Sequence, residues 1–443
     1  MNTPIADFVY NYNKENFSRF HMPGHKGRNI LGIEEYDITE IDGADVLYSA
    51  DGIINESENN ASALFGTAHS YYSAEGSTLA IKAMLSLVCS ECESRPLILA
   101  TRNVHKAFIY AAALIDFDVE WMYGEKEDHL CKCTLTPEKV KEHIDSCKEK
   151  PAAVYITSPD YLGNVADIKG IAEVCDGYDV PLLVDNAHGA YLAFCRDNIH
   201  PINLGASMCC DSAHKTLPCL TGGAYLHISE KAERFCGNAR RHLSLYASTS
   251  PSYLILQSLD LCNRYIDEKI RYDISDTSEK VRKLKSDLEK LRFAAFHNEP
   301  LKLTLDCNSY GYEGTEIHSQ LLKHKICCEY YDRQYIVFMF SPFNSDEDFA
   351  RLYECLSRTE KREPVKPTLL DISQKNETAL SIRNAVFSKS KITDIHSARG
   401  KICAAPSVSC PPAVPIVVSG EIITEEHIKA MEYYGIEKIS IVL

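Results

Sequence analysis

The chain has 443 residues, of which 45% are hydrophobic and 25% are charged, as expected for a globular protein with a sizeable core. Its formal net charge of -15 argues against nucleic acid as the main partner, because phosphate backbones attract clustered lysine and arginine. No apolar run approaches the roughly 18 residues of a membrane helix, so we expect no membrane partner and a cytoplasmic protein. The length of the chain predicts two or three domains.

The 18 cysteines predict buried, reduced side chains and no metal centre. The N-terminus lacks the basic and apolar stretches of a signal peptide, so we do not expect an oxidising compartment. Cys89 and Cys92 have CxxC spacing, and Cys131 and Cys133 bracket one lysine. No second pair follows at the interval of a zinc site, so the thiols are interpreted as structural.

Residues 1–60 read as irregular with short pieces of structure, and helix and strand patterns then alternate along the chain. Helices are predicted at 77–90, 105–115 and 168–178, and strands at 96–100, 152–157 and 180–187. Short apolar strands separated by helices are typical of a parallel sheet covered on both faces, with sites at the carboxyl ends of the strands. The sequence therefore predicts an α/β fold.

The second half of the chain predicts smaller α+β parts. Helices are indicated at 252–270, 275–291 and 345–362, and strands at 301–307 and 334–342. A charged, proline-containing link at 360–368 leads into the last part of the chain. We predict an N-terminal segment and large domain at 1–270, a small α+β domain at 271–362 and a C-terminal domain at 363–443.

Gly76, Ser77 and Thr78 stand where the helix at 77–90 begins. A glycine permits a tight turn, and the free N–H groups and positive dipole end of a helix bind phosphate. The same three residues could equally form an ordinary helix cap. His105 follows the strand at 96–100 and would emerge at the carboxyl edge of the sheet.

Asp185 ends the strand at 180–187, where a buried carboxylate needs a partner such as a protonated ring nitrogen. Ala187 is small enough to leave room for a flat ring, and His188 follows it. An acid at a strand end has many other uses, so Asp185 alone does not identify a cofactor.

Lys215 lies in "CCDSAHKTLPCL" (209–220), between small and apolar residues. Desolvation there would lower the pKa of the amine, and a neutral amine attacks carbonyl groups to form Schiff bases. Ser212 and His214 flank the lysine as phosphate ligands, although Lys215 could also be a surface residue. A phosphate cradle, a flat surface, an acid and a Schiff-base lysine together meet the needs of pyridoxal 5'-phosphate.

These motifs resemble the bacterial ornithine/lysine/arginine decarboxylase family. The similarity covers nearly the whole chain, and its most specific pieces are "FHMPGHKGR" (20–28), "DITEIDGADVLYSADGII" (37–54), "GSTLAI" (76–81), "RNVHKA" (102–107), "VDNAHGAY" (184–191), "SAHKTL" (212–217), "STSPSYLILQSLD" (248–260) and "PPAVPIVVSGE" (411–421). The resemblance implies a large domain of the aspartate-aminotransferase type, fold type I of the pyridoxal-phosphate enzymes, with a mostly parallel sheet and smaller α+β C-terminal domains.

The resemblance also implies roles for individual residues. Lys215 would form the Schiff base, Asp185 would hold the pyridine nitrogen, and His105 would stack on the ring. The phosphate ligands would be Ser77, Thr78, Ser212 and His214. Thr249 and Ser250 would reach the phosphate bound by the neighbouring subunit, so the active sites would lie at a homodimer interface.

Departures from the family pattern bear on assembly and substrate. The chain has no N-terminal wing domain of the kind with which larger members build decamers, so we expect a dimer or a small multiple of it. Ala413 stands where the family shows Gly, Ser419 where it shows Pro, and Cys410 where an aromatic residue is usual. The substrate side chain is bound near this segment, which leaves the substrate open. Glu421 is our candidate for binding its far amino or guanidino group.

The sequence thus predicts pyridoxal-phosphate-dependent decarboxylation of lysine, ornithine or arginine, as in polyamine biosynthesis. His105 or Lys215 would return the final proton. One alternative is an aminotransferase or lyase, which would clamp the substrate carboxylate with an arginine such as Arg333 or Arg351. A non-catalytic paralogue that acts as a binding protein is a second alternative.

Overall fold

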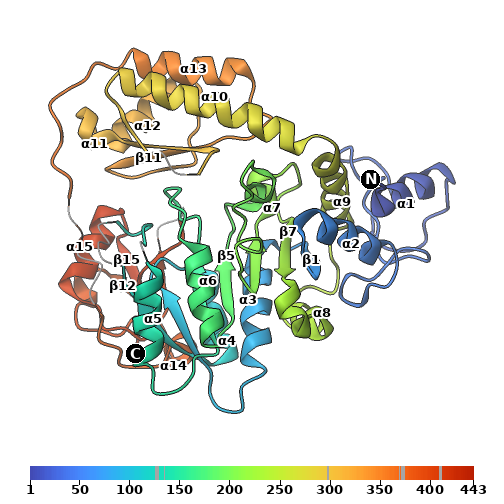
Figure 1. Ribbon diagram of the computed structural model, residues 1–443, viewed down its shortest axis with the longest axis horizontal. Helices are drawn as coiled ribbons and strands as arrows, with labels where there is room; N and C mark the ends of the chain where they lie inside the picture. Colours follow the sequence, from blue (N-terminus) through green and yellow to red (C-terminus); the bar gives the residue numbers. More distant parts are fainter. Residues whose placement is uncertain (125–128, 134, 297–298, 369, 371–374, 409–411) are drawn as a thin grey trace. The chain divides into compact units, whose positions relative to one another are not determined.

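The computed structural model describes residues 1–443 except 125–128, 134, 297–298, 369, 371–374 and 409–411 (Figure 1). The chain divides into two compact units, which we call unit 1 (1–96, 147–158 and 168–271) and unit 2 (97–146, 159–167 and 272–443). Unit 1 ends beside the boundary predicted at 270, whereas 97–146 group with unit 2. The division into three domains stays a prediction.

The sheet of unit 1 carries short, buried strands in the order β1-β7-β6-β5-β4. These are β1 (His69–Ser73), β4 (Ala153–Thr157), β5 (Leu182–Asp185), β6 (Met208–Asp211) and β7 (Ala224–Ile228). Strands β4, β5 and β6 run parallel, and β7 is antiparallel to both β6 and β1. The carboxyl ends of β4, β5 and β6 therefore meet at one edge of the sheet, which confirms the prediction for this part of the chain.

Helices of unit 1 cover this sheet. They are α2 (Ile53–Phe65), α3 (Gly76–Cys89), α6 (Ile168–Gly177), α7 (Ala213–Thr216), α8 (Cys236–Ser244) and α9 (Tyr253–Glu268), with short 3-10 turns η1 (Leu47–Ser49), η2 (Ala190–Phe194) and η3 (Glu230–Phe235). Helix α3 contacts β7, β6 and α8, and its side chains are buried almost all round. A helix apolar on every side belongs inside a domain, so its N-terminus is held firmly at the sheet edge.

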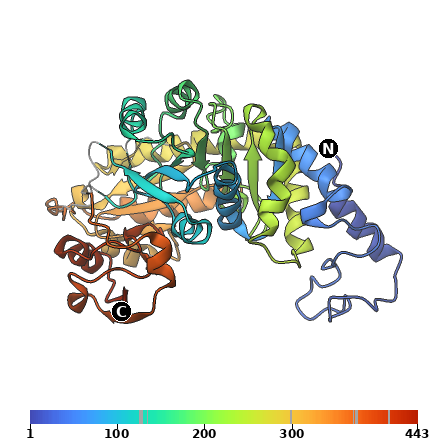
Figure 2. The same cartoon turned by 90° about the horizontal axis from the view of Figure 1, so that it is seen from below.

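The N-terminal region is more regular than predicted, because α1 (Pro4–Lys14) and α2 lie within or begin in residues 1–60. Only Ile5 and Val9 of α1 are buried, so the apolar pattern is too sparse to predict a helix. A tertiary contact stabilises the first turn of α1, because the N–H groups of Ile5 and Ala6 donate to Asp260 in α9. Figure 2 shows the segment between α1 and η1 as an irregular loop.

Unit 2 contains a parallel strand pair and a small α+β domain. The pair is β2 (Leu97–Thr101) and β3 (Asp118–Met122), with helices α4 (Lys106–Ile115) and α5 (Pro137–Ser146). The small domain has the sheet order β10-β11-β9-β8, formed by β8 (Ala294–Ala295), β9 (Lys302–Asp306), β10 (Tyr330–Tyr331) and β11 (Tyr335–Met339). Its helices are α10 (Ile270–Lys290), α11 (Cys307–Tyr310), α12 (Gly314–Lys323) and α13 (Asp346–Ser357), and α10, α12 and α13 share one core with β9 and β11.

The C-terminal part of unit 2 has its own apolar core. Its elements are α14 (Ile382–Phe387), β12 (Ser390–Asp394), η4 (His396–Ala398), β13 (Ser407–Val408), β14 (Pro415–Val417), α15 (Glu425–Tyr433) and β15 (Lys438–Val442). Strand β12 pairs with β15, and β13 with β14, both antiparallel. Arg383 in α14 donates to the carbonyls of Ala113 and Leu114 in α4, which ties this part to the β2–α4 segment.

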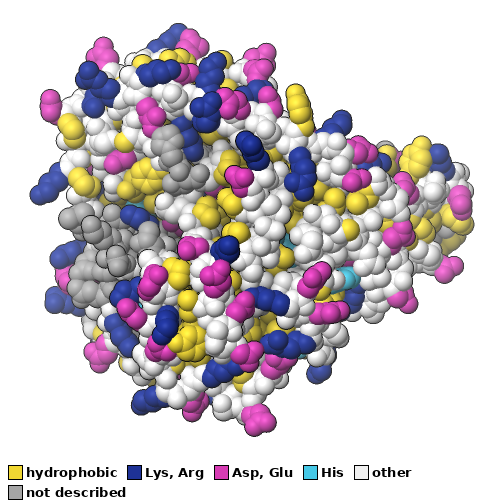
Figure 3. All heavy atoms as spheres, in the orientation of Figure 1, with side chains coloured by type: hydrophobic (Ala, Val, Ile, Leu, Met, Phe, Trp, Pro, Cys, Tyr) yellow, Lys and Arg dark blue, Asp and Glu magenta, His cyan; other side chains and the backbone are white. Residues whose placement is uncertain are grey.

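The face of the molecule seen in Figure 3 mixes charges of both signs. Of the helices in the described ranges, none has both the length and the apolar composition needed to cross a membrane. Large apolar side chains are nevertheless exposed in the loop between α1 and η1, where Phe20 is 95%, Leu31 83% and Ile30 82% accessible.

Candidate active site

Lys215 lies in α7, a helix of 4 residues that follows β6 directly. Its Nζ is 3.0 Å from Nε2 of His188. Ala213 and Thr216 of the same helix point inward and are buried, whereas Lys215 points outward and is exposed. The small and apolar sequence neighbours of Lys215 thus pack beneath it. The sequence predicted a weakly solvated amine, but in the single chain Lys215 is exposed.

Asp185 ends β5 with only 2% of its surface exposed, and hydrogen-bond donors reach both of its oxygens. The Tyr155 hydroxyl donates to Oδ2 across 3.2 Å. The backbone N–H of Ala187 and the Cys210 thiol donate to Oδ1, at 3.2 and 3.5 Å. Burial raises the pKa values of Tyr155 and Cys210 well above their ordinary range, so both stay protonated and able to donate.

The turn after β5 brings His188 back toward Lys215. The N–H of Gly189 donates to the carbonyl of Asn186 at 2.8 Å. A Cβ at residue 189 would lie 2.0 Å from Oδ1 of Asn186, so only glycine fits this turn. His188 is buried beside it, and Ala187 is half-buried. The "DNAHG" motif (185–189) therefore encodes both the acid at the strand end and a histidine that contacts the lysine.

Residues Gly76, Ser77 and Thr78 open α3, as the sequence predicts. Gly76 has φ of 71°, a left-handed conformation that favours glycine, and its N–H donates to Gly222. The preceding Glu75 makes no side-chain cap, so the first turn of α3 keeps its N–H groups for other acceptors. Ser77 is half-buried and Thr78 exposed.

The loop that contains Gly222 and Gly223 also contacts His214. Nδ1 of His214 lies 3.1 Å from the carbonyl oxygen of Gly223 and 3.4 Å from Oγ of Ser212. Burial lowers the pKa of His214. The loop thus links the start of α3 to α7, and the predicted phosphate ligands occupy connected segments of unit 1.

Thr249 and Ser250 are exposed, in a loop tied to the start of α3. The N–H of Ser248 donates to Oε1 of Glu75 at 2.6 Å, and the N–H of Ser250 donates to Oγ of Ser248. The loop therefore lies beside the predicted phosphate cradle of its own chain. Its contact with a neighbouring subunit's cofactor stays a prediction.

His105 and Glu421 belong to unit 2. His105 caps α4, where its Nδ1 accepts from the N–H of Ala107 at 3.1 Å. The N–H of Lys106 donates to the carbonyl of Ala413, which has φ of 59°. A left-handed alanine explains why a glycine would suit position 413. The β2–α4 junction and the segment after residue 411 therefore form one local structure.

Glu421 is buried, at 2% exposure, and was not expected to contact Arg102. Its Oε2 accepts from the N–H of Val418 at 2.7 Å and lies 3.4 Å from Nη2 of Arg102. Arg102 also donates to the carbonyls of Pro415 and Ile416. A role of Glu421 in substrate binding stays a prediction, and Cys410 lies outside the described residues.

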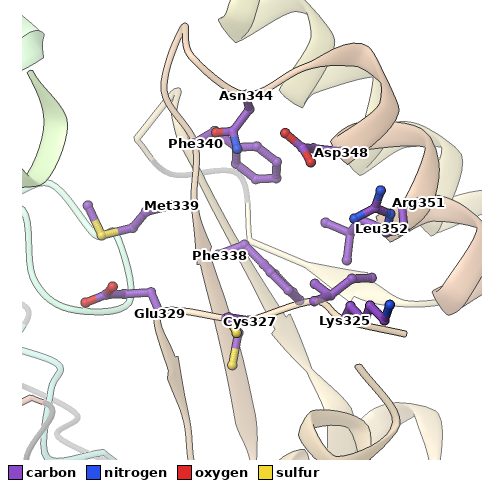
Figure 4. Close-up of a pocket in the computed structure, with 12 residues that line it drawn as sticks. Lys325, Cys327, Glu329, Phe338, Met339, Phe340, Asn344, Asp348, Arg351 and Leu352 are labelled. Carbon is purple, nitrogen blue, oxygen red and sulfur yellow. The ribbon is translucent and has the colours of Figure 1, made fainter. Parts of the chain in front are cut away.

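The two arginines of the aminotransferase alternative lie in unit 2. Arg333 stacks over the ring of Tyr433, 5.6 Å from its centroid. Arg351 lines a surface hollow of about 420 Å³ between α13 and the end of β11, together with Lys325, Asn344 and Asp348 (Figure 4).

A buried polar cluster behind β6 could not be found from the sequence. Asp211 accepts from Nδ2 of Asn186 at 2.6 Å and lies 3.0 and 3.2 Å from Nε2 of His200 and His227. Within the described part of the chain, His200, Cys209 and Asp211 form the one group whose ligand atoms could surround a metal ion. Asn186, His200, Asp211 and His227 come from four separate segments, so no local spacing signals them.

The residues of unit 1 fit pyridoxal phosphate by their donor chemistry. An amine, a carboxylate and an open helix N-terminus match the aldehyde, ring nitrogen and phosphate of that cofactor. Thr157 precedes Asp185 in the sequence, and Thr216 directly follows Lys215. The hydroxyls of these two threonines are buried without a hydrogen-bond partner among the described residues. Such polar atoms are rare in proteins and are consistent with a site for a polar ligand.

Comparison with known proteins supports this interpretation. Residues 3–302 match the family model described as "Orn/Lys/Arg decarboxylase, major domain". The chain is 27% identical over 455 residues to the uncharacterized protein YaaO of Bacillus subtilis (strain 168), covering 97% of this chain and 94% of that protein. It is 28% identical over 461 residues to an arginine decarboxylase of the same organism, with coverages of 96% and 92%.

Solved structures support the fold. The lysine decarboxylase LdcF of Francisella novicida superposes with a TM-score of 0.81 at 17% identity, covering 100% of this chain and 81% of that one. The constitutive lysine decarboxylase of E. coli gives a TM-score of 0.78 at 16% identity, with coverages of 100% and 82%. These similarities confirm the predicted α/β class and its fold type I architecture.

Proposed function

The chain belongs to the Orn/Lys/Arg decarboxylase family, and from this premise we propose that it removes the α-carboxyl group of lysine, ornithine or arginine as CO₂. Members of this family are pyridoxal-phosphate enzymes. The observation that carries the proposal is the arrangement of Lys215, 3.0 Å from His188, on a helix that follows β6 beside the Asp185 strand. An amine for the aldehyde and a buried carboxylate for the ring nitrogen, at one sheet edge, are what this cofactor requires.

Each residue of unit 1 receives a role under this proposal. Lys215 would bind the cofactor covalently through Nζ, and His188 beside it would exchange a proton with that nitrogen. Asp185 would hold a proton on the pyridine nitrogen, and the small Ala187 would leave space for the ring. Backbone N–H, hydroxyl and imidazole groups would hold the phosphate, in the segments that contain Gly76, Ser77, Thr78, Ser212 and His214. The cofactor, when bound, supplies the electron-withdrawing ring that weakens bonds to the substrate Cα.

Residues of unit 2 complete the proposal. His105 would stack on the cofactor ring, and either His105 or Lys215 would return the final proton. Glu421 serves the amino or guanidino end of the substrate. Support for that last role comes from its place in the family-like segment, and its carboxylate also contacts Arg102.

The active unit is proposed to be a homodimer, with Thr249 and Ser250 reaching the neighbouring subunit's phosphate. The several large apolar side chains exposed on the loop between α1 and η1 support it, because burial at an interface would remove them from water. A place in polyamine biosynthesis is part of the same proposal, because decarboxylation of a basic amino acid yields a diamine or agmatine. Cytoplasmic location is also part of it.

The cofactor is tested first. Purified protein loaded with pyridoxal phosphate should be yellow, and borohydride should fix the cofactor onto the peptide that contains Lys215, as read by mass spectrometry. Lys215→Ala should give no such adduct, while Lys231→Ala, a surface lysine paired with Asp176, should give the wild-type adduct. Protein that takes up no cofactor would contradict the proposal.

The reaction is tested with a substrate panel of lysine, ornithine and arginine. We expect CO₂ and the matching diamine or agmatine from at least one of them. Amination of a keto acid with all three substrates intact would establish the aminotransferase alternative. Cofactor binding without any turnover of amino acids would favour the non-catalytic paralogue.

A further inference from the structure

We infer that Tyr155 and Cys210 are positioning residues that orient Asp185 and set how strongly it holds a proton on the cofactor ring nitrogen. The inference rests on the proposed function, because it concerns the same site. Neither residue was suggested by the sequence, because each lies in a buried strand and contacts Asp185 only through the order of the strands in the sheet.

The geometry assigns one side-chain donor to each oxygen of Asp185. Tyr155 comes from β4 and reaches Oδ2, while Cys210 comes from β6 and reaches Oδ1, and β5 lies between these two strands. The Ala187 N–H provides a third donor, from the backbone. A carboxylate held from both sides and from its own turn has one orientation, which fixes the direction in which it meets a ring nitrogen.

Both side chains remain donors over the working range of the protein. Burial is the main cause that raises their pKa values, and the negative charge of Asp185 acts in the same direction. Hydrogen bonds to an ionised carboxylate stabilise the charged form and lower its proton affinity. Tyr155 and Cys210 therefore share the negative charge of Asp185 that a proton on the ring nitrogen would otherwise meet alone.

Other titratable groups nearby are engaged elsewhere. Lys215 and His188 contact each other. Cys209 and Asp211 flank Cys210 but, because side chains alternate along a strand, they face the opposite side of β6, where both lie near His200. This alternation supplies a matched control, since Cys209 and Cys210 are adjacent, fully buried thiols of which only Cys210 contacts Asp185.

A second control comes from β7. Tyr225 is as deeply buried as Tyr155, and its hydroxyl donates to Asn263 instead of Asp185. The test set is Tyr155→Phe, Cys210→Ala and the double variant, compared with Tyr225→Phe and Cys209→Ala. Cys210→Ser keeps a donor at the same position and should restore most of the wild-type behaviour.

The readout is the NMR chemical shift of the ring nitrogen, in protein loaded with pyridoxal phosphate that is isotopically labelled at that atom. It is followed against pH, together with the absorbance of the bound cofactor. Loss of one donor should raise the pH midpoint of the ring-nitrogen titration by roughly one unit, and the double variant should raise it further. The two control variants should titrate like the wild type.

The inference is overturned if the double variant titrates like the wild type, or if Tyr225→Phe and Cys209→Ala shift the midpoint equally, because packing alone would then explain the effect. Failure of the proposed function would look different. The wild-type protein itself would then bind no cofactor and show no ring-nitrogen signal, before any variant is compared.

Discussion

Arg102 and Glu421 form a buried ion pair whose partners come from opposite ends of unit 2 in the sequence. Arg102→Ala should lower the free energy of unfolding by about 3 kcal/mol, because the Glu421 charge would be left buried and unpaired. Urea unfolding followed by circular dichroism measures the loss. Lys141→Ala removes the exposed pair with Asp145 and should change the stability little. Equal effects of both substitutions would contradict this account of the pair.

The Asp211 cluster should make stability fall in acid. Burial holds the pKa of His227 below its ordinary value, so the unfolded chain binds this proton at a higher pH than the folded protein does. Burial alone would raise the pKa of Asp211, but His200 and His227 hold it well below its usual range. Both shifts remove stability as the pH falls, first below about 6.5 and then below about 4.

The free energy of unfolding, measured in urea at several pH values between 7 and 4, should therefore decrease with falling pH. His227→Gln removes one of the two titrations and should flatten the upper part of this dependence. Asp179→Asn, which changes an exposed carboxylate paired with Lys150, serves as the control and should leave that part unchanged. A wild-type protein equally stable at pH 7 and pH 5 would contradict the role of the cluster.

The start of α3 depends on the loop that supports it. Gly222 has φ of 103°, and a Cβ there would lie 3.0 Å from the carbonyl oxygen of Ala74. Gly222→Ala should cost about 1–2 kcal/mol of stability and weaken cofactor binding, because Gly222 accepts the hydrogen bond of Gly76. Gly237→Ala, in α8 with open space around it, should be neutral or stabilising. Thermal unfolding and a cofactor titration of both variants check the contrast.

At the level of elements, the alternation of strands and helices could be predicted from the sequence. The helix expected at 168–178 is α6 (Ile168–Gly177), and the strand expected at 152–157 is β4 (Ala153–Thr157). Strand β4 is buried and α6 buries one apolar stripe, so apolar spacing decides the structure of both. Helix α1 was missed because a distant residue, Asp260, stabilises its first turn.

The site was predictable in part, for a similar reason. Family membership was recognised from linear motifs, and the predicted Asp185, His188 and Lys215 do come together in the structure. Their supporting residues were not predictable. Tyr155 contacts Asp185 only because β4 and β5 are neighbours, and His200 meets His227 only because Asp211 lies between them. Contacts of this kind depend on strand order, which no short motif encodes.

For the whole molecule, the apolar loop after α1 makes assembly testable. Replacing both Ile30 and Leu31 by Asp should convert the proposed dimer into a monomer and weaken cofactor binding, because charged side chains oppose burial at an interface. Sedimentation velocity measures the oligomeric state. Ile392→Asp, at a position on β12 that is also well exposed, should leave it unchanged. A monomeric wild-type protein that binds cofactor normally would contradict the proposed interface.

The side chains at the carboxyl ends of β5 and β6, which point to both faces of the sheet, also affect the register in which these strands pair. Asp185 pairs in register with Cys210 on one face, while Asn186 bonds to Asp211 on the other. A shift of β6 by one residue would turn the Asp211 charge toward the cofactor side and leave two buried histidines without their acid. A shifted pairing of β5 and β6 would therefore be destabilised by unpaired buried charge on both faces of the sheet. The groups proposed to serve the chemistry thus also favour the correct strand register.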